Sequence, residues 1–237
     1  MFGLPEKLSD RSLRHAIFID RDGTINEEVN HLKSPDQLHL INGSADAIKE
    51  LNRAGLLAVC VTNQPVLARG DVNEDEIQKI HARLDQLLGE KNEYLDRLYL
   101  CPHHPDQGFD GEVKSLKIKC ECRKPSTGLI DTAVKELKIS RRNSWIIGDT
   151  TSDIVAGQKS GLKTILVKTG HAGRDKKFNI TPDYIMPDLN IAVKWILTGH
   201  ENFNKAILPV VSTALTSRII TLSGSDKVIS SLSARIL

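Results

Sequence analysis

The chain has 237 residues, of which 40% are hydrophobic and 26% charged, fractions that fit one or two globular domains and exclude a disordered or collagen-like protein. Its 32 basic and 30 acidic side chains are interspersed, and the resulting net charge of +2 provides no strong field for binding nucleic acid. The sequence has neither the ~20-residue apolar stretch of a membrane helix nor the apolar core of a signal peptide, so we expect a cytoplasmic protein with no membrane partner.

Short apolar segments alternate with amphipathic segments along most of the chain. The expected strands are residues 16–19, 57–61, 97–100, 144–147 and 164–167, and the expected helices are residues 45–54, 73–88, 127–137 and 153–160. This alternation predicts the α/β class, with a Rossmann-like parallel sheet covered by helices on both faces. Ligands of such sheets bind beyond the carboxyl ends of the strands, so polar residues at those ends are the first candidates for a site.

The pattern changes after Gly199. Residues 200–237 read as a polar segment, a strand, a loop of small residues and the start of a helix. Residues 224–231 can be compared with the phosphate-binding loop G-x-x-x-x-G-K-[ST], but Ile229 and Ser230 replace its glycine and lysine, so we expect no nucleotide binding. We therefore predict one domain over residues 1–199 and a C-terminal extension over residues 200–237. The extension is either a truncated or degenerate kinase-like segment or a strand and helix that pack on the domain.

The first expected strand leads into the sequence FIDRDGTIN, in which Asp20 and Asp22 are two residues apart. Side chains at positions i and i+2 of extended backbone point the same way, so both carboxylates can approach one substrate atom. Like charges this close require a cation or a proton between them. Taken alone, the pattern fits an exposed acidic turn closed by Gly23 equally well.

Three further polar groups follow expected strands or precede expected helices. Thr62 and Asn63 end one strand and can donate hydrogen bonds to phosphate without adding charge. Lys124 precedes a helix and can neutralise charge on a phosphoryl group. Asp149 follows a strand, with Asp153 four residues later, and such carboxylates favour Mg²⁺, although either residue can instead cap a helix.

These four ordered motifs resemble those of the haloacid dehalogenase superfamily of phosphotransferases, over about residues 14–198. The resemblance implies that Asp20 is a nucleophile that forms an aspartyl-phosphate, and that Asp22 protonates the leaving oxygen and then activates water. It also implies Mg²⁺ bound by Asp20, the backbone carbonyl of Asp22 and Asp149, with Asp153 in support. The implied ligands of the transferring phosphoryl group are Thr62, Asn63 and Lys124.

The sequence contains a second candidate metal site. Closely spaced thiols and imidazole suit a structural, tetrahedral Zn²⁺, and the candidate ligands are Cys101, His103, Cys120 and Cys122. A zinc ion would keep the polar loop 104–119 ordered. His104 can replace His103 as a ligand, and a disulfide or free thiols are the alternatives to a metal site. Cys60, within an apolar strand, is expected to be buried.

The sequence of the same loop resembles one branch of the superfamily more than the others. CPHHPD followed by CECRKP is similar to the heptose bisphosphate phosphatase branch, in which a zinc loop takes the place of a large cap domain; the histidinol-phosphate phosphatases share this loop. TNQPVLARG, with Arg69, and the following helix with His81 are more similar to the heptose enzymes. The HHPDQGF insertion resembles forms often fused to sugar nucleotidyltransferases or kinases. Arg69 and Arg123 would then bind the part of the substrate that is retained.

The resemblance implies a monomeric, Mg²⁺-dependent phosphatase of carbohydrate metabolism that acts on a phosphosugar. Its expected reaction is removal of the 7-phosphate from D-glycero-D-manno-heptose 1,7-bisphosphate, in heptose biosynthesis. Two other phosphatase activities remain as alternatives, on histidinol phosphate and on polynucleotide 3′-phosphate. A non-catalytic zinc-stabilised binding module is the alternative from another class. It would not need acidic side chains packed together at a cost in free energy.

Overall fold

The computed structural model describes residues 13–199 of the chain. The chain divides into two units, Met1–Lys194 and Trp195–Leu237, and of the second unit the structure describes only residues 195–199. The predicted extension over residues 200–237 lies outside the described residues, so its degenerate phosphate-binding loop stays a prediction.

The expected parallel sheet is confirmed. It has six parallel strands in the order β3-β2-β1-β4-β5-β6. The strands are β1 (Ala16–Ile19), β2 (Leu57–Asn63), β3 (Arg97–Cys101), β4 (Trp145–Gly148), β5 (Lys163–Val167) and β6 (Tyr184–Met186). The first five were expected within one or two residues at each end. The sequence analysis missed β6, because three residues are too few to show a hydrophobic period.

Four of the helices agree with the expected ones. The helices are α1 (Ser44–Arg53), α2 (Pro65–Ala68), α3 (Glu74–Gly89), α4 (Gly128–Leu137), α5 (Thr151–Lys159) and α6 (Leu189–Thr198). Asn73 caps α3 as expected, since its side chain accepts a hydrogen bond from the Glu76 backbone N–H at 2.9 Å. The sequence pattern did not predict α2, which is a single turn, or α6.

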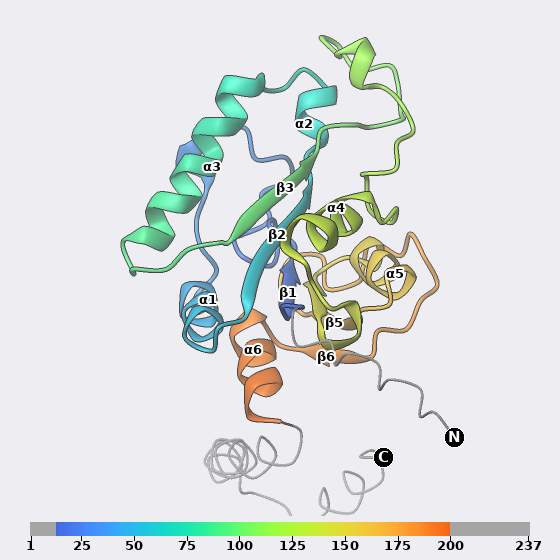
Figure 1. Ribbon diagram of the computed structural model, residues 1–237. Helices are drawn as coiled ribbons and strands as arrows, with labels where there is room; N and C mark the ends of the chain where they lie inside the picture. Colours follow the sequence, from blue (N-terminus) through green and yellow to red (C-terminus); the bar gives the residue numbers. More distant parts are fainter. Residues whose placement is uncertain (1–12, 200–237) are drawn as a thin grey trace, which may run out of the picture. The chain divides into compact units, whose positions relative to one another are not determined.

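The helices cover both faces of the sheet (Figure 1). The helices α1 and α3 lie on one face and α4 and α5 on the other, as right-handed crossovers require when the chain moves outward from β1 in both directions. On the second face, inward side chains of β1 and β2, including Phe18, Val59 and Val61, form one buried cluster with Leu129 and Ile130 of α4. Alternate residues of each strand thus fill the two layers of the core.

All strands of the sheet point the same way, so β1, β2 and β4 end at one edge. The loop between β3 and α4, green in Figure 1, projects beyond that edge. It contains only a short 3-10 helix, Lys114–Leu116, and in the described residues no inserted domain covers the strand ends. The predicted absence of a large cap is therefore confirmed.

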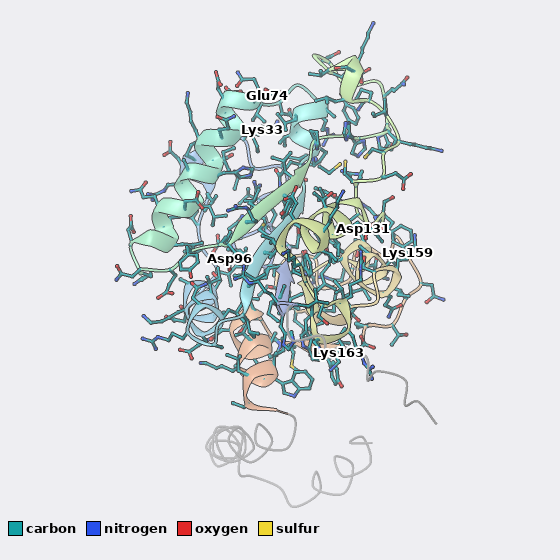
Figure 2. All side chains as sticks on the ribbon, in the orientation of Figure 1. Lys33, Glu74, Asp96, Asp131, Lys159 and Lys163 are labelled. Atoms are coloured by element: carbon teal, nitrogen blue, oxygen red, sulfur yellow. The ribbon has the colours of Figure 1, made fainter. Side chains whose placement is uncertain are left out.

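Charged side chains of both signs project from the outer elements of the unit. Figure 2 shows Lys33 and Glu74 near one end of α3, and Asp131 and Lys159 on the other side of the sheet. This mixture agrees with the balanced composition. Within residues 13–199, no helix has the length and apolar character needed to cross a membrane.

Candidate active site

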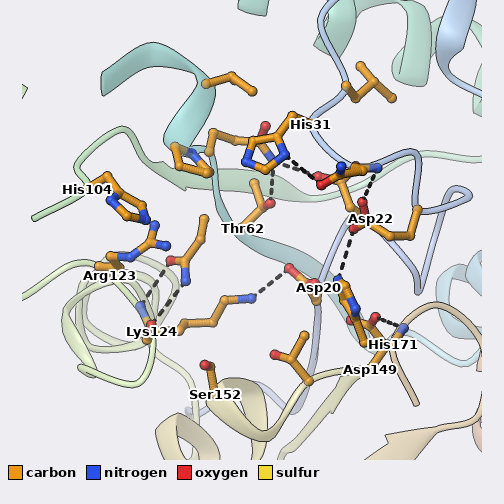
Figure 3. Close-up of a pocket in the computed structure, with 18 of the residues that line it drawn as sticks. Asp20, Asp22, His31, Thr62, His104, Arg123, Lys124, Asp149, Ser152 and His171 are labelled. Atoms are coloured by element: carbon orange, nitrogen blue, oxygen red, sulfur yellow. Dashed lines mark hydrogen bonds and ion pairs between the residues drawn. The ribbon is translucent and has the colours of Figure 1, made fainter. Parts of the chain in front are cut away.

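Three carboxylates from separate elements meet at the carboxyl ends of β1 and β4. Oxygen atoms of Asp20, Asp149 and Asp153 lie within 4.8 Å of one another. Lys124 points into this group, and its Nζ lies 2.7 Å from Asp20 Oδ1 (Figure 3). The same Nζ lies 2.6 Å from Asp153 Oδ1. Its third contact is a 2.6 Å hydrogen bond to the Val61 backbone carbonyl. Asp20 and Lys124, which are 104 positions apart in the sequence, thus belong to one buried ionic cluster.

The cluster contains more negative than positive charge. Burial raises the pKa of Asp20 to about 7, although Lys124 opposes the shift. Burial also raises the pKa of Asp149 to about 9, with further contributions from the charges of Asp20 and Asp153. Burial alone would lower the pKa of Lys124, but Asp153 and Asp20 outweigh it, so its pKa is raised and the ammonium stays charged. An additional cation would therefore stabilise the ionised carboxylates.

The carboxylates fit a hard divalent cation such as Mg²⁺. The Oδ2 atom of Asp149 accepts a 2.6 Å hydrogen bond from the His171 backbone N–H, whereas Oδ1 is buried and finds no hydrogen-bond partner among the described residues. A buried carboxylate oxygen without a donor is costly unless a ligand meets it. The backbone also closes tightly here, because a Cβ at Gly23 would lie 2.4 Å, and one at Gly170 2.3 Å, from Asp149 Oδ2.

Asp22 lies beside Asp20 but belongs to a different network. Arg21, whose side chain is fully buried, donates to both oxygens of Asp22 at 2.8–3.0 Å. Gln64 Nε2 and Asn26 Nδ2 donate at 2.9 Å each. Burial would raise the pKa of Asp22, but the Arg21 charge and these donors lower it, so the carboxylate is ionised in the absence of substrate.

The Arg21 guanidinium also binds a histidine of α3. The Nη1 atom of Arg21 lies 3.2 Å from His81 Nε2. Burial and the Arg21 charge lower the pKa of His81 to about 4, so a neutral imidazole accepts the hydrogen bond from Arg21. His81, on the helix that was compared with the heptose enzymes, thus contacts the arginine beside Asp22. His81 supports the arginine that holds Asp22.

Asp153 takes part in capping α5 and also pairs with Lys124. It is the N3 residue of α5 and, in a capping box, its Oδ2 accepts hydrogen bonds from the Thr150 backbone N–H at 3.0 Å and hydroxyl at 2.6 Å. Its other oxygen pairs with Lys124. Helix capping thus fixes the carboxylate that orients Lys124.

Asn63 and Thr62 have different surroundings, although both were predicted to hold the phosphoryl group. Both polar atoms of the Asn63 amide bind the backbone of Lys124, with Nδ2 at 3.1 Å from its carbonyl oxygen and Oδ1 at 3.0 Å from its nitrogen. Asn63 therefore positions Lys124. The Thr62 hydroxyl accepts a 2.8 Å hydrogen bond from Gln64 Nε2, which leaves its own proton available to donate in the pocket.

A cavity of about 400 Å³ extends outward from the carboxylates. Arg69 and Arg123 both line it, as predicted for contacts with the retained part of the substrate. The sequence analysis did not single out several other lining residues, which include His31, Phe109, His171 and Lys177. Gln64 directly follows the predicted pair at the end of β2, so its position was a usable signal. The contribution of loop residues such as His31 had no comparable signal.

The cysteine and histidine side chains of the second candidate metal site also lie close to one another. The Cys101 and Cys122 sulfurs lie 3.1 Å apart, and Cys120 Sγ is 3.3 Å from Cys122 Sγ. His103 Nδ1 lies 3.2 Å from Cys122 Sγ. The imidazole of His104 instead accepts a hydrogen bond from the Asp106 backbone N–H, so His103 is the histidine of this cluster. Three thiol sulfurs and one imidazole nitrogen gathered in this way could hold a tetrahedral Zn²⁺.

The two candidate metal-binding groups are connected through adjacent residues. Cys122 precedes Arg123 and Lys124, and Arg123 Nη1 donates to the His103 carbonyl at 3.2 Å. At the end of β3, the Cys101 carbonyl accepts from the Gln64 backbone N–H at 2.8 Å. The fourth cysteine, Cys60, is fully buried in β2 as expected.

Comparisons with known proteins agree with this geometry. A family model described as HAD-hydrolase-like matches residues 121–192. The chain is 40% identical over 159 residues to the D-glycero-beta-D-manno-heptose-1,7-bisphosphate 7-phosphatase of Pasteurella multocida, covering 67% of this chain and 84% of that protein. It is 35% identical over 192 residues to the D-glycero-D-manno-heptose-1,7-bisphosphate 7-phosphatase of Chlorobaculum tepidum, covering 78% and 94%. The crystal structure of a D,D-heptose 1,7-bisphosphate phosphatase from B. bronchiseptica, complexed with magnesium and phosphate, is similar with a TM-score of 0.68 and 29% identity, covering 78% of this chain and 98% of that one.

Proposed function

Because this chain belongs to the haloacid dehalogenase-like hydrolases, among the heptose bisphosphate phosphatases, we propose that it removes the 7-phosphate from D-glycero-D-manno-heptose 1,7-bisphosphate. The observation that carries the chemistry is the convergence of Asp20, Asp149 and Asp153 around Lys124. The choice of substrate is supported by the relatives' activity and by two arginines that line the cavity, Arg69 and Arg123. Arginine suits the phosphate that such a substrate retains.

The reaction begins with Asp20. A carboxylate oxygen attacks phosphorus while the bond from phosphorus to the sugar oxygen breaks, which leaves an aspartyl-phosphate and the sugar. Lys124 and the hydroxyl of Thr62 would bind oxygens of the transferring group, and Asn63 would hold Lys124 in place. Mg²⁺, held by Asp149, Asp20 and the Asp22 carbonyl, would supply positive charge to offset repulsion between nucleophile and phosphate.

Asp22 would supply and remove the protons. The Arg21 charge lowers the pKa of Asp22, but a phosphate dianion beside the carboxylate would raise that pKa by repulsion between like charges. The protonated carboxyl can then donate to the departing sugar oxygen. Once the sugar has left, the Asp22 carboxylate takes a proton from the water that attacks the aspartyl-phosphate, which releases inorganic phosphate and restores Asp20.

A substrate panel tests the proposed activity. We expect kcat/KM for one anomer of the heptose bisphosphate to exceed that for histidinol phosphate and for a 3′-phosphorylated oligonucleotide by about 100-fold, because buried polar groups built for one substrate are unpaired with another. The measurement is release of inorganic phosphate, with both heptose anomers in the panel. Faster cleavage of histidinol phosphate or the oligonucleotide would replace the proposed substrate. No turnover of any phosphate ester would favour a binding module.

The proposed magnesium site makes a separate prediction. Asp149→Asn should raise the Mg²⁺ concentration required for half-maximal activity by at least about tenfold, because one anionic ligand becomes neutral. EDTA should stop the wild-type reaction, and added Mg²⁺ should restore it. The matched control is Asp85→Asn, on the exposed side of α3, which should leave the Mg²⁺ dependence unchanged. Metal-independent turnover by the wild-type protein would contradict the assignment.

The second metal group is proposed as a structural zinc site with no open position, formed by Cys101, His103, Cys120 and Cys122. The compact set of three sulfurs and one nitrogen supports this proposal. Its role would be to order loop 104–119 and the adjoining Arg123 and Lys124. The monomeric state and the cytoplasmic location stay predictions from the sequence.

A further inference from the structure

The loop that carries Phe109 is attached to the segment that carries Arg69. The Val113 backbone N–H donates to the Ala68 carbonyl at 3.0 Å. On the other side of Arg69, a Cβ added to Gly70 would lie only 1.9 Å from the Gly111 carbonyl oxygen. Both neighbours of Arg69 in the sequence are therefore packed against the backbone of this loop.

Phe109 makes the contact to the Arg69 side chain itself. The Arg69 guanidinium carbon lies 4.1 Å from the centroid of the Phe109 ring, a cation–π geometry. The ring is also contacted by Lys117 Nζ, at 4.5 Å, and by the His104 ring in an edge-on arrangement with centroids 6.4 Å apart. The Phe109 ring therefore contacts two cationic side chains and one histidine ring.

The remaining contacts fix the ring in place. A carboxylate oxygen of Glu112 accepts hydrogen bonds from the backbone N–H groups of Gly108 and Phe109, at 2.9 and 3.2 Å. The Lys117 side chain is 1% exposed, its ammonium is 3.7 Å from Glu112, and it finds no hydrogen-bond partner within the described part of the chain. The Phe109 ring is therefore a principal neighbour of this buried cation, which limits where the ring can move.

Arg69 lines the same cavity as Asp20 and Lys124. Its guanidinium also contacts His31 Nε2. Burial and the Arg69 charge lower the pKa of His31, which favours the neutral imidazole that accepts this contact. Two contacts, from Phe109 and from His31, thus set the direction of the guanidinium. Such preorganisation lowers the conformational entropy that is lost when an anion binds.

We propose that Phe109 is a positioning residue for substrate specificity, holding the Arg69 guanidinium where it binds the anionic group that the substrate retains after hydrolysis. The inference rests on the proposed function, since it requires a substrate with two phosphates. It assigns Phe109 no contact with the reacting phosphate. Loss of the ring should therefore weaken binding of a bisphosphate and leave the chemical step unchanged.

The test compares a bisphosphate with the matched monophosphate. We expect Phe109→Leu to raise KM for heptose 1,7-bisphosphate about five- to tenfold, the range of one partly desolvated cation–π contact, and to change kcat by less than about twofold. Its kinetics with heptose 7-phosphate should match those of the wild type. Arg69→Gln should show a larger rise in the same KM, and the double variant should be no worse than Arg69→Gln alone.

Two further variants keep the test interpretable. Ile118→Ala changes an exposed apolar residue of the same loop and should leave both substrates unaffected. Arg69→Lys keeps the charge but loses the planar group that stacks on the ring, so it should reproduce the selective rise in KM even if Phe109→Leu does not fold. Thermal unfolding and zinc content of each variant identify those that have lost the loop structure.

Specific outcomes would overturn the inference. A fall in activity that is equal for the two substrates would mean that Phe109 only stabilises the loop. Additive effects of Phe109→Leu and Arg69→Gln would mean that the two residues act independently. If the wild type prefers another bisphosphate, the proposed function fails, and the same comparison with that bisphosphate and its monophosphate still tests Phe109. A wild type that prefers no bisphosphate over its monophosphate would contradict both.

Discussion

Replacing Asp20 with asparagine should reduce release of inorganic phosphate by about 10⁴-fold or more, because loss of a nucleophile removes most of the rate enhancement of an enzyme that uses one. The amide has nearly the shape of the carboxylate, and Lys124 keeps its ion pair with Asp153. The pocket should therefore remain formed while the aspartyl-phosphate cannot form. The measurement is single-turnover phosphate release at saturating Mg²⁺, together with mass spectrometry of the trapped protein for an added phosphoryl group.

The control for this variant is Asp131→Asn. Asp131 lies on α4 and pairs with Arg141 at 2.7 Å, away from the pocket lining. Its side chain is about half exposed, so the substitution should change turnover by less than about twofold. Turnover of Asp20→Asn within tenfold of the wild type would mean that another group attacks phosphorus.

Cys122→Ser should remove the zinc proposed for the cysteine–histidine cluster and, with it, most of the activity. Structural zinc contributes ~10–16 kcal/mol to the folding of zinc-finger peptides, so the loss of even about 3 kcal/mol here would lower Tm by roughly 10 °C at this chain length. Activity should fall because Cys122 immediately precedes Arg123 and Lys124, and the Arg123 contact to the His103 carbonyl depends on the same cluster. Elemental analysis, thermal unfolding and phosphate release measure the three effects.

Cys60→Ala is the matched control, because Cys60 is buried in β2 and does not belong to the cysteine–histidine cluster. It should keep about one zinc per chain and lose only about 1 kcal/mol of stability, as expected for a small cavity in a core. A wild-type protein without zinc, or a Cys122→Ser protein with unchanged Tm and activity, would remove the structural role of the metal.

The sequence predicted the sheet because its strands are short apolar segments of the length and composition that parallel sheets require. It also predicted which side chains meet, since residues that follow parallel strands share one edge; Asp20 and Asp149 are the example. Which side chains form hydrogen bonds with one another depends on the directions in which they point, and the sequence pattern does not contain this information. The two hydrogen bonds from Asn63 to the Lys124 backbone and the buried Arg21 between Asp22 and His81 became visible only in three dimensions.

The loop contributions were the least predictable. Phe109 lies in a polar segment without a hydrophobic period, so its contacts with Arg69 and Lys117 depend on how that loop folds back on α2. Likewise, the choice of His103 over His104 for the cysteine cluster was left open by two adjacent histidines. In the structure His103 lies against Cys122, whereas His104 accepts a hydrogen bond from the Asp106 backbone N–H.

The close approach of Gly23 and Gly170 to the Asp149 carboxylate has a consequence for how such enzymes can diverge. A Cβ at either position would lie 2.4 Å or less from Asp149 Oδ2, so a larger residue at Gly23 or Gly170 would require the carboxylate or the backbone beside it to shift. Arg69 and Phe109 line the cavity from other segments of the chain, so replacing them does not require a change at Gly23 or Gly170. New substrates can therefore be acquired at the entrance while the hydrolytic chemistry is inherited unchanged.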